Sequence, residues 1–165
     1  MVRVFLGLGA NLGDRLGNLR GARHQLQQAP GVNLSAASAL YETHPVGGPP
    51  GQNDYLNAVL AVRTTLSPRE LLHLCQTIEA NFARQRRETW GPRTLDIDLL
   101  LYGNEILQEK DLIVPHPQLH RRAFVLQPLT DLAPDLPHPI LEQTPRELLA
   151  ELPAGGGLRK LCMEW

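Results

Sequence analysis

Two aspartates stand two positions apart in an otherwise apolar run, residues 95–101. Side chains at positions i and i+2 of a β-strand lie on the same face, so a strand here would place the carboxylates of Asp96 and Asp98 side by side. Adjacent carboxylates repel each other and lose hydration on burial unless a cation holds them. Because Mg²⁺ takes oxygen ligands and often shares them with substrate phosphates, the pair predicts a magnesium site. The opposite face of the strand is expected to carry Leu95, Ile97, Leu99 and Leu101.

The two carboxylates have a structural alternative, because an Asp-x-Asp on an exposed edge strand needs only water around it. The apolar run that contains them, with Trp90 and Arg93 close by, favours metal ligation instead.

A group of arginines precedes the apolar run: Arg84, Arg86, Arg87 and Arg93. A single arginine at a helix end is usually solvated and is favoured by the helix dipole. Several guanidinium groups together can bind phosphate oxygens through paired hydrogen bonds. We therefore interpret this segment as a phosphate site, and its position before the aspartates favours chemistry on a metal polyphosphate.

The elements that position these residues follow from apolar periodicity and turn signals. Strands are expected over residues 2–8, 32–42 and 55–65, with a last strand from the aspartates to about residue 103. A first helix begins after Asn11 or Asp14 and ends near Pro30. A second begins at Ser67-Pro68, which offers an N-cap followed by proline at the first helical position.

The resulting order, β-α-β-β-α-β, predicts a ferredoxin-like α+β fold. Such a fold has an antiparallel sheet with both helices on one face, and it can leave the other face free. C-terminal helical additions are expected near residues 123–132 and 145–152. We expect residues 1–165 to form a single domain.

Composition excludes several classes of protein. The net charge of -1 gives no general attraction to nucleic acid or to an anionic membrane, and no apolar run reaches the ~18 residues of a membrane span. The two cysteines, Cys75 and Cys162, support neither a disulfide framework nor a zinc site. A cytoplasmic, reducing location is expected, with no nucleic-acid or membrane partner.

Other motifs are less specific. Residues 7–13 follow a strand and are rich in glycine, but their spacing differs from a dinucleotide fingerprint, so we interpret them as a tight turn. His116 and Arg122 form a second group of cations downstream. From spacing alone, Tyr55 and Phe124 are interpreted as core residues.

Residues 90–98, Trp-Gly-Pro-Arg-Thr-Leu-Asp-Ile-Asp, resemble the signature of the 6-hydroxymethyl-7,8-dihydropterin pyrophosphokinases. Further segments resemble that family in the same order along nearly the whole chain: 9–13, 41–43, 54–58, 115–117 and 122–126. The resemblance implies that MgATP gives its β,γ-pyrophosphoryl group to the hydroxymethyl oxygen of a reduced pterin. The products would be AMP and the pterin diphosphate, in folate biosynthesis, and we expect the enzyme to be a monomer.

The resemblance also implies roles for residues. Asp96 and Asp98 would hold two Mg²⁺ ions, and Arg84 and Arg93 would act with them in catalysis. Nucleotide or phosphate contacts would come from Gln76, Glu79, Arg84, Arg86, Arg93, His116 and Arg122. The pterin pocket would contain Thr43, Val46, Tyr55, Asn57, Trp90 and Phe124. Here Tyr55 and Phe124 flank the pterin ring, which replaces their interpretation as core residues.

The chain departs from the family pattern at Ala83, Thr89 and His44, so Arg86 and Arg87 could exchange roles. A general base is not identified, and Asp98 or a metal-bound water are both possible. Two further hypotheses use the same residues. The arginine segment could belong to a nucleic-acid-binding module, or the aspartates could serve a metal-dependent phosphohydrolase.

Overall fold

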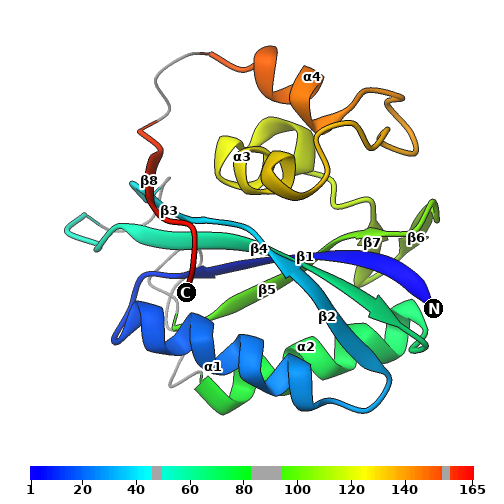
Figure 1. The fold of residues 1–165 in the computed structure, drawn as a ribbon, viewed down its shortest axis with the longest axis horizontal. Coiled ribbons are helices and arrows are strands. Elements are labelled where there is room, and N and C mark those ends of the chain that lie inside the picture. The colour runs from blue at the N-terminus through cyan, green and yellow to red at the C-terminus, as the bar shows by residue number, and fades with distance from the viewer. Residues whose placement is uncertain (46–49, 83–93, 154–156) are drawn as a thin grey trace.

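The computed structural model describes residues 1–45, 50–82, 94–153 and 157–165 (Figure 1). These parts of the chain contain eight strands, four α-helices and one 3-10 helix. The first half contains β1 (Val2–Ala10), α1 (Arg15–Gln28), β2 (Val32–Ala37), β3 (Leu40–Thr43), β4 (Tyr55–Thr64) and α2 (Pro68–Phe82). The second half contains β5 (Asp96–Tyr102), β6 (Leu107–Glu109), β7 (Leu112–Val114), the 3-10 helix η1 (Leu119–Arg121), α3 (Ala123–Leu132), α4 (Pro145–Ala150) and β8 (Arg159–Cys162).

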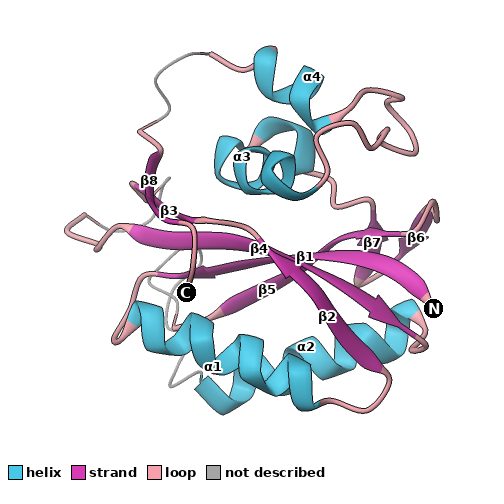
Figure 2. Cartoon of the chain, in the orientation of Figure 1, coloured by secondary structure: helices cyan, strands magenta, loops and turns pink. Residues whose placement is uncertain are grey.

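The main sheet has the order β5-β1-β4-β3-β8, and β2 also pairs with β4. Each of these pairings is antiparallel. Helices α1 and α2 lie side by side on one face of the sheet, as Figure 2 shows. This arrangement confirms the predicted ferredoxin-like α+β fold.

Local side-chain hydrogen bonds set the starts of the first two long helices. Asp14 caps α1, because its Oδ1 accepts a hydrogen bond from Gly17 N at 3.0 Å. Ser67 and Glu70 form a reciprocal pair at the start of α2, with the Ser67 hydroxyl accepting from Glu70 N and the Glu70 carboxylate accepting from Ser67 N. Each bond satisfies an amide that has no partner within the helix.

The strands differ from the sequence prediction in two respects. The strand expected over residues 32–42 is divided into β2 and β3, because Ser38 turns inward and its hydroxyl accepts a hydrogen bond from Val59 N at 2.8 Å. The tail forms an unexpected strand, β8, which pairs with β3. The second face of the sheet is not free, because α3 packs on it over an apolar cluster that includes Phe5 and Leu126.

Leu101 lies on the other face from the one expected. Leu95, Ile97 and Leu99 pack in the cluster beneath α1 and α2, as the alternation predicts. A register shift between β1 and β5 pairs Phe5 with Leu101 and Leu6 with Leu99, which leaves Leu100 as an extra residue. Such a bulge changes the alternation of the residues after it, so Leu101 joins the α3 face.

The two free thiols are expected to differ sharply in reactivity. Cys75 is buried, and burial together with the nearby carboxylates of Glu79 and Asp98 raises the pKa of its thiol to about 12. Cys162 is exposed. At pH 8 a disulfide reagent should therefore modify one thiol in the folded protein and two in guanidinium chloride, as counted by mass spectrometry.

A Cys162→Ser variant is the control, and it should remain unmodified while folded. Rapid modification of this variant would contradict the burial of Cys75.

Candidate active site

Asp96 and Asp98 occupy the first and third positions of β5, and both side chains are half-buried. Their apolar neighbours Leu95 and Ile97 pack beneath α1 and α2, so the two carboxylates lie together on the opposite face. They stand at the start of the strand, where the sheet meets the loops. The pair therefore has the geometry that the sequence suggested.

A row of three paired residues crosses the sheet at this end. Gly9 of β1 pairs with Asn57 of β4 on one side and with Asp96 of β5 on the other. Two strand spacings of ~4.8 Å place the Cα atoms of Asn57 and Asp96 about 10 Å apart. A Cβ at Gly9 would lie 3.3 Å from Asn57 Oδ1 and 3.7 Å from Tyr55 Cδ1. Because Gly9 has no side chain, the sheet surface stays open between the residues expected to bind pterin and those expected to bind metal.

The Asn57 side chain is fixed by a buried hydrogen bond. Its Nδ2 donates to Thr43 Oγ1 at 2.9 Å, and the two residues are 5% and 7% exposed. Tyr55 stands two positions earlier on β4, so its ring is on the same face as Asn57. Three residues expected in the pterin pocket thus meet at the ends of β3 and β4.

The turn at residues 9–13 connects this pocket to α1. Asn11, which is buried, donates from Nδ2 to Gln52 Oε1 at 3.2 Å and to the Asn53 carbonyl at 3.1 Å. The sequence suggests Asn11 as a helix cap and as part of the segment 9–13 that resembles the family, but neither reading predicts its hydrogen bonds to residues 52 and 53. The hydrogen-bond partners of Asn11 lie about 40 residues further along the chain, so no local sequence pattern predicts these bonds.

A half-buried ion pair adds a second link to the same loop. Arg15 donates to the Asp54 carbonyl and to the Glu42 carboxylate, each at 2.8 Å. Glu42 also accepts from Arg159 of β8. The Arg15 guanidinium, with help from Arg159, lowers the pKa of the Glu42 carboxyl, so the pair stays charged near neutral pH.

His116 is affected by two charged neighbours, the Asp98 carboxylate and the Arg122 guanidinium. Burial has the largest effect and lowers the pKa of its imidazole. The nearby Asp98 raises the pKa and the Arg122 guanidinium lowers it, so the pKa lies below its ordinary value of 6.5. His116 Nδ1 accepts a hydrogen bond from Gln118 N at 3.1 Å, so the neutral ring carries its proton on Nε2. The Arg122 guanidinium lies 5.6 Å from the centre of the Phe124 ring. The structure thus brings His116, Arg122 and Phe124 to the Asp98 side of the site.

The two candidates on α2 differ. Glu79 turns toward β5, and its Oε2 accepts a hydrogen bond from Ile97 N at 2.9 Å, between the two aspartates. Gln76 is exposed on the helix surface. The remaining candidates lie outside the described residues: Val46, Arg84, Arg86, Trp90 and Arg93.

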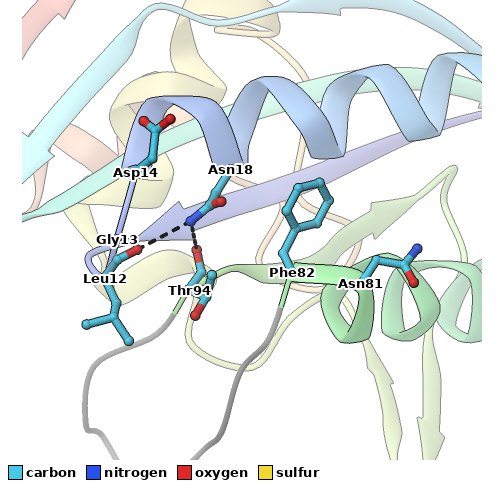
Figure 3. Close-up of a pocket in the computed structure, with 7 residues that line it drawn as sticks. All are labelled: Leu12, Gly13, Asp14, Asn18, Asn81, Phe82 and Thr94. Carbon is cyan, nitrogen blue, oxygen red and sulfur yellow. Dashed lines mark hydrogen bonds between the residues drawn. The ribbon is translucent and has the colours of Figure 1, made fainter.

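A cavity of about 580 Å³ lies next to the site, between the start of α1, the end of α2 and Thr94 (Figure 3). None of its lining residues was expected to bind a ligand. They are Leu12, Gly13, Asp14, Asn18, Asn81, Phe82 and Thr94. The described parts of the chain contain no group of three or more His, Cys, Asp or Glu side chains placed to hold a metal. Nor do they contain a helix long and apolar enough to cross a membrane.

Comparison with known proteins identifies relatives over most of the sequence. Residues 5–134 match the family described as 7,8-dihydro-6-hydroxymethylpterin-pyrophosphokinase (HPPK). The 2-amino-4-hydroxy-6-hydroxymethyldihydropteridine pyrophosphokinase of Methylorubrum extorquens is 44% identical over 156 residues, covering 94% of this chain and 97% of that protein. The protein of the same name from Pseudomonas aeruginosa is 44% identical over 154 residues, covering 93% and 94%.

Solved structures share the fold. HPPK-DHPS of Plasmodium falciparum with pteroate matches with a TM-score of 0.72 and 16% identity, over 91% of this chain and 42% of that chain. The same wild-type protein with SDX-DHP gives a TM-score of 0.69 and 17% identity, over 92% and 43%. The chain therefore spans less than half the length of these solved proteins.

The electrostatic neighbours of His116 can be tested in the metal-free protein. Its imidazole should titrate below 6.5, the ordinary value. Asp98→Asn should lower the midpoint further, because a charge that favours the imidazolium is lost, and Arg122→Gln should raise it. The measurement is an NMR titration of the histidine ring signals, and a midpoint unmoved by both substitutions would contradict this arrangement.

Proposed function

The chain belongs to the 7,8-dihydro-6-hydroxymethylpterin-pyrophosphokinase family, and we propose how its residues divide the work of that enzyme. The enzyme transfers pyrophosphate from MgATP to the hydroxymethyl group of 6-hydroxymethyl-7,8-dihydropterin, which yields AMP and the pterin diphosphate in folate biosynthesis. The observation that carries the assignment of the site is the row Asn57–Gly9–Asp96. It places the Asn57 amide and the Asp96 carboxylate on either side of a residue without a side chain.

We assign Asp96 and Asp98 as the protein ligands of two Mg²⁺ ions. Two carboxylates are few for a metal site formed by protein alone, but they suit Mg²⁺, which commonly takes one or two carboxylates and completes its octahedron with water and phosphate oxygens. When bound, the ions neutralise phosphate charge and orient the attacking and leaving oxygens. The pair stands at the start of β5, where both side chains are only half-buried, so a nucleotide could approach the carboxylates from that end.

We assign Asn57, Thr43 and Tyr55 to the pterin, with Phe124 across from Tyr55 and Val46 and Trp90 as further wall residues. An asparagine amide can both donate to and accept from the polar edge of a heterocycle. The bond from Asn57 Nδ2 to Thr43 Oγ1 fixes which way the amide faces. An aromatic ring such as Tyr55 can stack on the planar pterin.

Phosphoryl-type transfer depends on in-line positioning and on neutralising charge. His116 lies near both Asp98 and Arg122, and we assign His116 and Arg122 to the phosphates. Neutral His116 can donate its Nε2 proton to a phosphate oxygen, since Nδ1 is already occupied by Gln118 N. Further charge would come from Arg84, Arg86 and Arg93, and nucleotide contacts from Gln76 and Glu79.

Three further expectations stay predictions: the single domain over residues 1–165, the monomeric state and the cytoplasmic location. Of the two other hypotheses, the phosphohydrolase is separated from the kinase by its products. An assay with MgATP, with and without the pterin, should give AMP only when the pterin is present. Release of inorganic phosphate from ATP alone at a similar rate would instead support hydrolysis.

Loss of either aspartate should abolish most activity. Asp96→Asn and Asp98→Asn each keep the size of the side chain but remove a negative charge from the metal site. We expect kcat to fall by at least about 100-fold in either variant, measured as AMP formation at saturating MgATP.

The control for this prediction is Asp135→Asn, because Asp135 is an exposed acid that forms an ion pair with Arg146 on the protein surface. Its activity should be unchanged. Near-normal turnover in the Asp96 and Asp98 variants, with circular dichroism like the parent, would reject the metal assignment.

The orientation of Asn57 should control binding of the pterin more than binding of ATP. Thr43→Val removes the hydroxyl that accepts from Asn57 Nδ2 and leaves a buried donor without its partner, which costs about 1–3 kcal/mol. If that cost falls on pterin binding, KM for the pterin should rise about 10-fold while KM for ATP changes little.

Thr43→Ser keeps the hydroxyl and should bind the pterin nearly normally. Equal effects of the valine and serine variants would show that the hydrogen bond does not matter.

A further inference from the structure

Asn18 is a polar residue of the first turns of α1 whose side chain is aimed away from its own helix. Its Nδ2 donates to the Leu12 carbonyl at 3.3 Å and to the Thr94 carbonyl at 3.2 Å, as Figure 3 shows. An asparagine amide has two N–H donors, so one side chain can serve both carbonyls at once. Asn18 therefore joins the turn before α1 to the residue that leads into β5.

The position of Thr94 matters because Asp96 is only two residues further along. Leu95, the residue between them, is 2% exposed and packs in the cluster beneath the helices. On the other side, Ile97 N is held by the carboxylate of Glu79. The start of β5 is thus fixed by one polar side chain from α1 and one from α2, and a shift of Thr94 would pass directly to the Asp96 carboxylate.

The packing of the two helices keeps Asn18 at the right distance. Gly21 stands three residues after Asn18, on the same side of α1. A Cβ at Gly21 would lie 2.4 Å from Phe82 Cζ, so the absent side chain is what allows the Phe82 ring to rest against α1. Phe82 lines the same cavity as Asn18, and its contact with α1 holds the end of α2 beside α1.

We propose that Asn18 is a positioning residue for the metal-binding carboxylates, acting through the Thr94 backbone. The proposal rests on the proposed function, in which Asp96 and Asp98 hold the magnesium of MgATP. Loss of the two hydrogen bonds makes the start of β5 more mobile, so the carboxylates of Asp96 and Asp98 are no longer held in position to bind Mg²⁺.

Asn81 provides a matched control on the same cavity. It is also an asparagine that lines the cavity, but its Nδ2 donates to Gln25 Oε1 at 2.8 Å on the surface between α1 and α2. Asn18→Asp and Asn81→Asp therefore add the same charge beside the same cavity. Only the first removes donors from the carbonyl of Thr94.

The first measurement is independent of turnover. Hydrogen–deuterium exchange of a peptide covering residues 94–102 is followed in the protein without nucleotide. Exchange should be faster in Asn18→Asp and unchanged in Asn81→Asp. If the aspartate variant fails to fold, Asn18→Leu takes its place, since leucine has a similar size and no polar atoms.

The second measurement is the Mg²⁺ dependence of AMP formation. The Mg²⁺ concentration for half-maximal rate should rise about 10-fold, or kcat fall by a similar factor, while KM for the pterin changes less than about 2-fold. Exchange and Mg²⁺ dependence like those of the parent in both Asn18 variants would overturn the proposal, and so would equal effects of Asn81→Asp. A failure of the metal assignment is recognised separately, because Asp96→Asn would then keep the parent's Mg²⁺ dependence.

Discussion

The site depends on two glycines in the middle of a sheet. Val4, Leu6 and Leu8 of β1 fill the core beneath α1 and α2, whereas Gly7 and Gly9 present no side chain to the opposite face. Glycine inside a strand costs conformational entropy and leaves nothing to pack, so the position needs a reason. The reason is the closeness of neighbouring side chains. Asn57 and Asp96 flank Gly9, where a Cβ would lie 3.3 Å from Asn57 Oδ1. A Cβ at Gly7 would lie 3.3 Å from Leu100 Cδ1.

The antiparallel topology explains why the functional side chains gather at one end. The end of β1 and the starts of β4 and β5 lie next to each other, because neighbouring strands run in opposite directions. The turn after β1 and the loop before β4 therefore leave the sheet at the same edge. Asn11 and Arg15 use this closeness, since both bond residues of the loop that precedes Tyr55.

Sequence patterns identified what local chemistry decides. The i, i+2 spacing gave the shared face of Asp96 and Asp98, and the Ser-Pro-x-Glu pattern gave the start of α2 at Pro68. The features that these patterns did not predict depend on partners far along the chain. An asparagine such as Asn11 can cap a helix or bond a distant loop, and only the tertiary fold decides between them. The bulge at Leu100 likewise arises from pairing with β1, because no local pattern marks the extra residue.

The described residues also show how charge is divided around the proposed metal site. His116 is mostly neutral near pH 7, because burial and Arg122 outweigh the attraction of Asp98. The neutral ring therefore contributes a hydrogen-bond donor and no charge. Arg122 is the nearby group that stays cationic at all working pH values. A phosphate that approaches Asp98 meets the repulsion of its carboxylate unless a metal ion lies between them, and this repulsion favours the magnesium complex of the nucleotide over the free nucleotide.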